Sequence, residues 1–325
     1  MTRTEKVLII GSGPAGYTAA IYAARSGLKP LLISGLEPGG QLMITTEVEN
    51  FPGFENPVQG PWLMEQMKNQ ALSFGTRIQN DKVIEVKFND YPFQVVTEKN
   101  TQISSYSVII STGAKARWLN IPGEESFMGF GISACATCDG FFFKNKNVAV
   151  VGGGNTAVEE ALYLSNLCNK VTLIHRRDQL RAEKILQDRL LSKKNVNYLW
   201  NSEVKEFVGS EKPKTLEKLI IKSKTNLSEL KVDGAFVAIG HTPSTEIFHN
   251  SLDMDTEGYI YTKNKSTQTS INGIFAAGDV TDKIYRQAVT AAGMGCMGAI
   301  EAEEFLSKKK NYLEIMFLII FSWVL

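Results

Sequence analysis

Cysteine and histidine are scarce in this sequence. Its 325 residues include 4 cysteines and 3 histidines, and only Cys135 and Cys138 stand close together, as a CxxC pair. A structural zinc ion takes four ligands, almost always cysteine or histidine side chains. Cys168 and Cys296 lie in helical patterns elsewhere, and no histidine is near the pair. We therefore expect no metal site, and we expect Cys168 and Cys296 to be small buried core residues.

An excess of charge of one sign is also missing. Lysine and arginine total 35, and aspartate and glutamate total 34, which gives a formal net charge of +1. Proteins that bind nucleic acid usually carry a strongly basic face. The balanced charge offers no general field that would collect a polyanion, so we expect no nucleic-acid partner.

Long apolar runs are absent from the start of the chain. Met1–Lys6 leads directly into Val7–Ile10, far shorter than the apolar core of a secretion signal. The apolar run Ile315–Leu325 would form a helix of roughly 16 Å, short of the roughly 30 Å hydrocarbon layer of a membrane. We expect a cytoplasmic protein without a transmembrane span. We assign no catalytic role to the apolar tail, residues 312–325.

The CxxC pair is the most informative feature that the sequence does contain. In a reducing compartment such a pair is more often catalytic or metal-binding than structural. Because zinc lacks further ligands, we interpret Cys135 and Cys138 as a redox pair. Asp139 follows directly, and a carboxyl group beside a thiolate can act as general acid and base. The alternative is that Asp139 is only a turn residue before Gly140.

Two glycine-rich fingerprints each follow an apolar strand and open a predicted helix. The first, Gly11-Ser12-Gly13-Pro14-Ala15-Gly16, comes after Val7–Ile10. The second, Gly152-Gly153-Gly154-Asn155-Thr156-Ala157, comes after Val148–Val151. In this context the glycines allow a tight turn and let a pyrophosphate approach the start of the helix. The pair of fingerprints therefore predicts two dinucleotide sites.

The chain uses this plan twice, with one copy inside the other. The strand pattern Val108–Ala114 resembles Ala235–Pro243, and a buried strand at Gly273–Asp279 with a helix from about Gln287 to Leu306 completes the first copy. We therefore predict an α/β fold with two nested Rossmann-like dinucleotide-binding domains. The first domain comprises residues 1–114 and 245–311, and the inserted domain comprises residues 115–244. Two short crossings between domains favour a hinge.

Cations follow the strand after the second fingerprint. His175-Arg176-Arg177-Asp178 ends this strand, and Arg181 lies a few residues on. An NAD site places a carboxylate here to bind the ribose hydroxyl, whereas guanidinium groups suit the 2′-phosphate of NADPH. We therefore predict an NADPH site; the alternative is a solvated basic start of a helix. After the first fingerprint the corresponding acid is less clear, because Glu37 lies past the strand.

Together these motifs resemble those of the low-molecular-weight, bacterial-type thioredoxin reductases. The resemblance runs from about Val7 to Leu306, and its most specific strings are Ser133–Gly140 and His175–Asp178. It implies that FAD binds in the first domain, with contacts from Gly11, Ser12, Gly13, Pro14, Ala15, Gly16, Gly35, Leu36, Glu37, Pro38, Gly39, Gly40, Gln41, Leu42, Asn50, Thr112, Gly113, Gly278, Asp279, Val280, Arg286, Gln287 and Ala288. It implies that NADPH binds in the inserted domain, with contacts from Gly152, Gly153, Gly154, Asn155, Thr156, Ala157, His175, Arg176, Arg177 and Arg181.

The resemblance also implies catalytic roles and a partner. Cys138 would face the flavin, Cys135 would attack the disulfide of thioredoxin, and Asp139 would handle protons. Members of the family form homodimers. We therefore predict an NADPH-dependent flavoprotein that reduces thioredoxin through a Cys135–Cys138 redox disulfide. The alternatives are a flavoprotein that feeds a peroxidase or another thiol protein, and a non-turnover NADPH or redox sensor.

Overall fold

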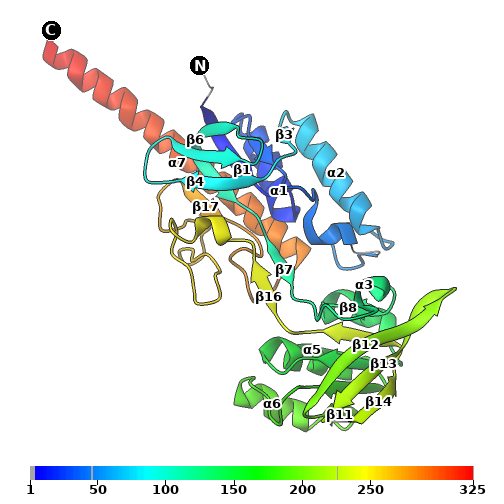
Figure 1. Cartoon of the computed structure of the whole chain (residues 1–325). Coiled ribbons are helices and arrows are strands. Elements are labelled where there is room, and N and C mark those ends of the chain that lie inside the picture. The colour runs from blue at the N-terminus through cyan, green and yellow to red at the C-terminus, as the bar shows by residue number, and fades with distance from the viewer. Residues whose placement is uncertain (1–3, 45–46, 225, 325) are drawn as a thin grey trace. The chain divides into compact units, whose positions relative to one another are not determined.

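The computed structural model describes residues 4–44, 47–224 and 226–324, with side chains up to residue 309 except that of Ile44. The chain divides into two compact units (Figure 1): unit 1 is Met1–Lys115 with Thr242–Leu325, and unit 2 is Ala116–His241. Unit 2 is thus inserted into unit 1. The two segments that join the units pair with each other as β7 (Ala114–Ala116) and β16 (His241–Pro243).

Unit 1 is built on a parallel sheet with an antiparallel edge. Its strand order is β3-β2-β1-β6-β5-β4, with β17 paired to β6. The inner strands are apolar on both faces, because α1, α2 and α7 cover one face, and Phe248 of a short 3-10 helix and Ile260 of a loop cover the other. The strands are β1 (Glu5–Ile10), β2 (Leu31–Ile33), β3 (Arg77–Gln79), β4 (Val83–Lys87), β5 (Phe93–Thr97), β6 (Gln102–Ile110) and β17 (Ile274–Ala276).

Helix α1 (Pro14–Arg25) begins at the first fingerprint and packs closely on α7 (Ala288–Val324). A Cβ added to Gly295 of α7 would lie 2.1 Å from the carbonyl oxygen of Ala15, so the two backbones approach where neither helix has a large side chain. Ala19 and Ala23 of α1 are fully buried. The other helical segments of unit 1 are η1 (Gly40–Ile44), α2 (Gly60–Ser73) and η3 (Glu246–Phe248).

Helix α7 differs from the sequence prediction at its end. The predicted helix stopped near Leu306, but α7 continues to Val324. Residues 307–324 contain no glycine or proline that would end a helix. Because side chains after Lys309 lie outside those described, the interpretation of the apolar tail stays a prediction. Within the described ranges, no helix is long and apolar enough to cross a membrane.

Unit 2 repeats the plan with a smaller sheet, whose order β11-β10-β9-β15-β8 has parallel pairings throughout. Its strands are β8 (Ile132–Ser133), β9 (Asn147–Val151), β10 (Lys170–Ile174), β11 (Val196–Leu199) and β15 (Gly234–Val237). Its helical segments are α3 (Glu124–Phe127), α4 (Ala136–Asp139), η2 (Gly140–Phe143), α5 (Asn155–Ser165) and α6 (Lys184–Leu191). Helix α5 packs on one face of this sheet.

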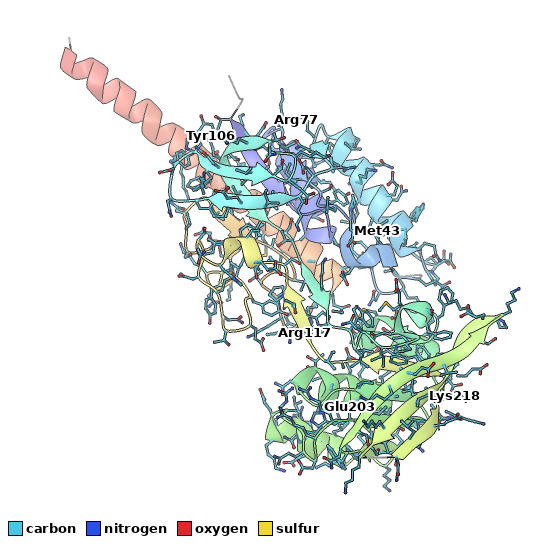
Figure 2. All side chains as sticks on the ribbon, viewed as in Figure 1. Met43, Arg77, Tyr106, Arg117, Glu203 and Lys218 are labelled. Carbon is cyan, nitrogen blue, oxygen red and sulfur yellow. A yellow bond between two sulfur atoms is a disulfide. The ribbon has the colours of Figure 1, made fainter. Side chains whose placement is uncertain are left out.

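A three-stranded antiparallel sheet packs on the other face, and the sequence analysis did not include it. Its strands are β12 (Ser202–Glu211), β13 (Lys214–Ser223) and β14 (Asn226–Lys231). Phe207 and Leu219 turn inward from it, whereas Lys218 pairs with Glu229 at 2.7 Å on the outside (Figure 2). Each unit has a parallel sheet with a strand that leads through a glycine loop into a helix, β1 into α1 and β9 into α5, which confirms the predicted α/β fold with nested Rossmann-like units.

Candidate active site

The first fingerprint forms a tight loop between β1 and α1. Gly11 has φ +109°, and a Cβ added there would lie 2.2 Å from the carbonyl oxygen of Ser111. A Cβ on Gly16 would lie 2.0 Å from the carbonyl oxygen of Gly11. At Gly13, by contrast, an added Cβ would meet no described heavy atom within 4 Å. The loop is therefore closed by the backbone of Gly11 and Ser111 on one side and open at Gly13, where α1 begins and an anion is favoured.

Ser12 ties this loop to the segment 35–42. Its buried hydroxyl donates to the carbonyl oxygen of Ser34 at 2.7 Å and accepts the N–H of Gly39 at 3.0 Å. A Cβ on Gly40 would lie 3.4 Å from the Cα of Gly13. The structure thus brings the predicted flavin-lining segment against the fingerprint. Leu36 and Glu37, within that segment, are exposed.

Asp279 lies directly after β17 and close to the start of α1. The neighbouring Gly278 has φ +84°, and a Cβ on it would lie 3.0 Å from the Cβ of Ala15. Burial raises the pKa of the Asp279 carboxyl to about 7, with a further contribution from Asp282 that Arg286 partly opposes. No described residue forms a hydrogen bond with Asp279 Oδ1. A buried acceptor therefore stands beside the first fingerprint.

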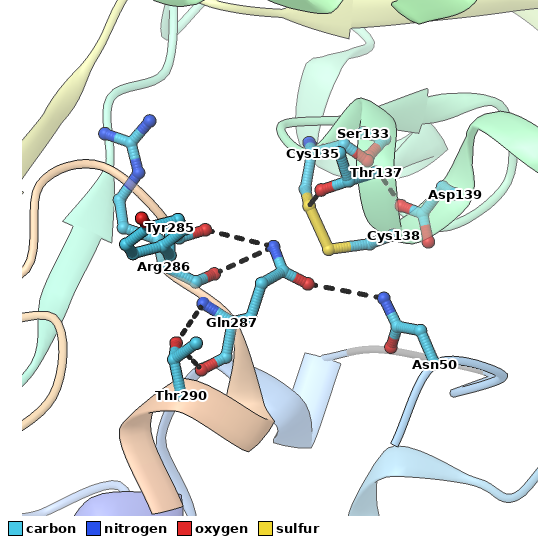
Figure 3. The surroundings of a disulfide bond; sticks show 10 residues. All are labelled: Asn50, Ser133, Cys135, Thr137, Cys138, Asp139, Tyr285, Arg286, Gln287 and Thr290. Carbon is cyan, nitrogen blue, oxygen red and sulfur yellow. Dashed lines mark hydrogen bonds between the residues drawn. A yellow bond between two sulfur atoms is a disulfide. The ribbon is translucent and has the colours of Figure 1, made fainter. Parts of the chain in front are cut away.

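The loop after Asp279 is organised by its own hydrogen bonds. The Asp282 carboxylate accepts the backbone N–H groups of Ile284 at 2.8 Å, Tyr285 at 3.0 Å and Arg286 at 3.3 Å. The Gln287 side chain donates to the carbonyl oxygens of Tyr285 and Arg286 and accepts Asn50 Nδ2 at 3.3 Å (Figure 3). Sequence analysis named Asn50, Arg286 and Gln287 but missed Asp282. The sequence feature that could have identified Asp282 is an aspartate at the start of a loop, where its carboxylate can accept the backbone N–H groups of the next few residues.

Thr112 and Gly113 follow β6 at the edge of the sheet where the first fingerprint follows β1. The Thr112 hydroxyl donates to the carbonyl oxygen of Ser244 at 2.7 Å, and Gly113 accepts the N–H of Ser244 at 2.9 Å. Both residues therefore connect the two chain segments of unit 1 near its carboxyl-end edge. Val280, also named from the sequence, is fully buried behind this edge.

The second fingerprint forms the equivalent loop in unit 2, between β9 and α5. A Cβ on Gly152 would lie 2.4 Å from the carbonyl oxygen of Ala238, and a Cβ on Gly153 would lie 2.3 Å from the imidazole of His175. Gly154, which precedes α5, has no described heavy atom within 4 Å of an added Cβ. This loop is therefore closed by Ala238, the residue after β15, and by His175, and it is open at Gly154.

The predicted cations lie next to this loop. The backbone N–H of Arg181 donates to the carbonyl oxygen of Gly153 at 2.7 Å. Arg176, Arg177 and Arg181 are exposed, whereas His175 is buried. Burial lowers the pKa of His175, and the charge of Arg181 lowers it further. The imidazole is therefore neutral near pH 7, and its Nε2 has no hydrogen-bond partner among the described residues.

Cys135 and Cys138 form a disulfide between the end of β8 and α4, with Cα atoms 5.3 Å apart (Figure 3). The Cys135 sulfur lies 3.4 Å from the hydroxyl of Thr137. The prediction of a buried core residue is right for Cys168, where burial raises the thiol pKa to about 11. It is wrong for Cys296, which is half-buried and interacts with the exposed Tyr22 of α1.

Asp139 ends helix α4 and reaches back to Ser133. The Ser133 hydroxyl lies 2.5 Å from Asp139 Oδ2, and the backbone N–H of Cys135 donates to the same hydroxyl at 3.0 Å (Figure 3). Burial raises the pKa of the Asp139 carboxyl, and the hydrogen bond from Ser133 opposes this effect. The structure thus joins a perturbed carboxyl to the disulfide through one serine, which the sequence analysis quoted without a role.

Comparisons with known proteins agree with these motifs. The family model described as pyridine nucleotide-disulphide oxidoreductase matches residues 5–295. A thioredoxin reductase of Rickettsia conorii is 58% identical over 310 residues, covering 95% of this chain and 100% of the relative. One of Escherichia coli O157:H7 is 52% identical over 313 residues, covering 94% and 97%.

A solved structure shares the whole fold. The thioredoxin reductase from Giardia duodenalis has a TM-score of 0.90 and 38% identity, covering 94% of this chain and 100% of that chain. These similarities span both fingerprints and the disulfide. The chain therefore belongs to the pyridine nucleotide-disulphide oxidoreductase family and, within it, to the low-molecular-weight thioredoxin reductases.

Proposed function

We propose that this chain is an enzyme, an NADPH-dependent flavoprotein that reduces the disulfide of thioredoxin. The observation that carries the proposal is the Cys135–Cys138 disulfide, which lies beside the half-buried carboxyl of Asp139 in a unit with its own dinucleotide loop. A second dinucleotide loop lies in unit 1. Two dinucleotide sites and one redox disulfide meet the needs of an electron path from NADPH to a protein disulfide.

The residues of unit 1 fit FAD. Gly13 offers open backbone at the start of α1, where the helix dipole favours the pyrophosphate. Asp279 Oδ1 is a buried acceptor without a donor among the described residues, which suits a ribityl hydroxyl of the flavin. We assign the FAD contacts to the residues of unit 1 that the sequence analysis named.

The residues of unit 2 fit NADPH. Gly154 offers open backbone at the start of α5, as Gly13 does for α1. Exposed Arg176, Arg177 and Arg181 supply the positive charge that a 2′-phosphate prefers. Neutral His175 closes the loop without adding charge. We therefore propose that these four side chains and the fingerprint residues hold NADPH.

When bound, NADPH and FAD supply the two electrons that open the Cys135–Cys138 disulfide. The Cys135 thiolate then attacks one sulfur of the thioredoxin disulfide, which forms a mixed disulfide and releases one thiolate of thioredoxin. The Cys138 thiolate attacks the Cys135 sulfur, which restores the Cys135–Cys138 bond and releases the second thiolate. Two electrons leave the dithiol in this exchange, and two protons complete the dithiol of thioredoxin.

Asp139 is placed to exchange protons with the cysteine pair. Because burial raises its pKa, this carboxyl keeps its proton to a higher pH than an exposed aspartate would. A thiolate that leaves during the exchange needs a proton, and a carboxyl that holds one nearby can supply it. We propose that Asp139 is this acid. When a thiol of the pair loses its proton to become a thiolate, Asp139 is the base that accepts that proton.

We also propose that the protein is a cytoplasmic homodimer. Unit 1 exposes apolar side chains on neighbouring elements: Tyr22 on α1, Phe74 after α2 and Ile300 on α7. The guanidinium of Arg25 on α1 lies 5.1 Å over the Phe74 ring, and Tyr22 on α1 interacts with Cys296 on α7, so α1 contacts both of the other elements. Aromatic and arginine side chains of this kind are typical of interfaces. Sedimentation of the purified protein should give twice the chain mass.

The domain division follows the same proposal. We assign residues 1–114 and 245–311 to the FAD domain and residues 115–244 to the NADPH domain. The two compact units, with Ala116–His241 as the inserted one, support this assignment. The role of the apolar tail is not part of it.

One assay tests the function. Protein purified with its own flavin should oxidise NADPH rapidly only when thioredoxin is present, and Cys135→Ser or Cys138→Ser should abolish that turnover. Cys296→Ser, a half-buried cysteine outside the pair, is the matched control and should retain it. A sensor would bind NADPH without turnover. A reductase that feeds another thiol protein would oxidise NADPH with a peroxidase but not with thioredoxin.

A trapping experiment separates the two cysteines. In Cys138→Ser the remaining Cys135 should form a stable mixed disulfide with a thioredoxin that lacks its second cysteine. Cys135→Ser should form none. Trapping through Cys138 alone would reverse the proposed roles.

A further inference from the structure

Ser133 is a buried serine at the end of β8, and its hydroxyl has contacts on two sides. It lies 2.5 Å from Asp139 Oδ2, and it accepts the backbone N–H of Cys135 at 3.0 Å (Figure 3). A third group, the carbonyl oxygen of Cys135, lies 3.4 Å from it. Ser133 is only 7% exposed, so water competes little for these bonds.

A hydroxyl has one hydrogen to donate and two lone pairs that accept. The N–H of Cys135 occupies one lone pair of Ser133. When the Asp139 carboxyl is ionised, the Ser133 hydrogen points to Oδ2. When the carboxyl is protonated, its own hydrogen can point to the second lone pair of Ser133, and the serine hydrogen then turns to the carbonyl oxygen of Cys135. One side chain can therefore satisfy both protonation states without any movement of heavy atoms.

This property matters because Asp139 is half-buried and its Oδ2 faces the buried hydroxyl of Ser133. A buried carboxylate that lacks a donor is costly, and a buried carboxylic acid that lacks an acceptor leaves its hydrogen unpaired. A side chain at position 133 that could only donate, or could do neither, would satisfy at most one state. The Asp139 carboxyl would then have to change its position or its hydrogen-bond partner whenever it gained or lost a proton.

We propose that Ser133 is a positioning residue, whose hydroxyl pairs with the Asp139 carboxyl in both protonation states and so holds it in one place beside Cys135 and Cys138. This inference rests on the proposed thiol–disulfide exchange, since only that reaction asks Asp139 to change its protonation. Ser133 acts through Asp139, since its hydroxyl bonds to the Asp139 carboxyl and to the backbone of Cys135.

A simpler role for Ser133 is to satisfy the backbone N–H of Cys135. That role alone predicts that loss of the hydroxyl lowers the stability of unit 2 and leaves the titration of Asp139 unchanged. The positioning role predicts that the titration itself moves. The measurement must therefore follow Asp139 directly.

The experiment uses the flavin-loaded full chain labelled with carboxyl-¹³C aspartate. The ¹³C signal of Asp139, identified by its loss in Asp139→Asn, is followed against pH in the oxidised protein. The variants are Ser133→Ala, Ser133→Thr and Ser133→Val. Threonine and valine have nearly the same shape and differ by the hydroxyl, so this pair decides the matter if the alanine variant does not fold. Ser202→Ala is the matched control, because Ser202 is a buried serine of unit 2 with bonds to Trp200 and Ser223.

We expect the Asp139 midpoint to rise by roughly one pH unit in Ser133→Ala, because the bond to the carboxylate is stronger than the bond to the neutral acid. Ser133→Val should show the same rise, and Ser133→Thr and Ser202→Ala should titrate like the unmodified protein. Equal midpoints with and without the hydroxyl would overturn the proposal, as would an equal rise in Ser202→Ala. The titration needs no turnover, so its outcome is separate from that of the thioredoxin assay.

Discussion

Two side chains, Asp279 and His175, each have one buried polar atom that finds no partner among the described residues. A buried polar atom without a hydrogen bond costs about 1–3 kcal/mol. Both side chains lie beside the open end of a glycine loop. A ligand that forms a hydrogen bond with each atom would remove this cost. Asp279 and His175 therefore destabilise the free protein and stabilise the protein with its ligands bound.

Asp279 gives a pH dependence with a definite sign. Its pKa in the folded protein is about 7, above the ordinary 3.8, so the folded state binds the proton more tightly than the unfolded state. This contribution to stability is fully present below about pH 4 and is lost as pH rises toward 7, at up to about 1.4 kcal/mol per pH unit.

We therefore predict that, with FAD removed, Asp279→Asn flattens the fall in stability between about pH 4 and pH 7. Urea unfolding at a series of pH values measures it. Asp90→Asn, an exposed acid of unit 1, is the control and should leave the slope unchanged. An unchanged slope in Asp279→Asn would place the titrating group elsewhere.

Arg181 gives a prediction about cofactor choice. A charge-assisted hydrogen bond to phosphate is worth about 1.5–3 kcal/mol, so Arg181→Gln should raise KM for NADPH by at least about tenfold. KM for NADH, which lacks the 2′-phosphate, should hardly change. Arg189→Gln, an exposed arginine on α6, is the matched control. Equal losses with NADPH and NADH would show that Arg181 does not bind the phosphate.

At the scale of single elements, the glycines of the first fingerprint have two different roles. One is required by the packing of the backbone, and the other leaves space for a ligand. A Cβ on Gly16 would collide with the carbonyl oxygen of Gly11, whereas a Cβ on Gly13 would enter open space. Gly13 also has φ −70°, which any residue can adopt.

We predict that Gly13→Ala folds normally but binds FAD at least about tenfold more weakly, because the methyl group blocks the approach of the pyrophosphate. Gly16→Ala should instead lose stability by more than about 1 kcal/mol even without FAD. Thermal unfolding of the flavin-free variants and FAD titration by fluorescence separate the two effects. A Gly13→Ala protein that retains FAD at unchanged affinity would rule out this phosphate position.

Helix α7 shows how an element gains support beyond its predicted end. The ammonium group of Lys309 lies 2.8 Å from the centre of the Tyr91 ring and 5.6 Å from that of Phe305. A cation over aromatic faces is worth about 0.5–2 kcal/mol. This contact holds the helix to unit 1 after the point where the sequence prediction ended it.

At the scale of the whole molecule, the function requires three different approaches, two to the flavin and one to thioredoxin. The nicotinamide must reach the flavin, the Cys135–Cys138 pair must reach it, and Cys135 must also reach a protein substrate. One fixed arrangement of the two units cannot serve all three. We therefore predict that unit 2 rotates on the two joining segments, β7 and β16.

A cross-link that holds the disulfide at the flavin should slow flavin reduction by NADPH at least about a hundredfold. Reduction by a small chemical reagent should be unaffected, which serves as the internal control. Stopped-flow absorbance measures both. Reduction by NADPH at full speed in the locked protein, with normal thioredoxin turnover, would remove the need for rotation.

The two dinucleotide loops, the nested order of the units and the redox pair could be predicted from the order of the residues alone. These features depend on short-range chemistry: glycine where a Cβ would collide with backbone, as at Gly11 and Gly152, and cysteines three positions apart. Apolar runs that alternate with helical patterns were enough to predict the parallel strands.

Which polar groups meet depends instead on how the elements fold together. Ser133 and Asp139 are six positions apart, and their contact depends on the turn of α4. Ser12 reaches Gly39 across β2, and the exposure of Cys296 depends on where α1 lies. The three-stranded sheet β12-β13-β14 also escaped prediction, because its alternating pattern is weak and its register depends on the face it covers. Such contacts join residues whose proximity no local pattern encodes.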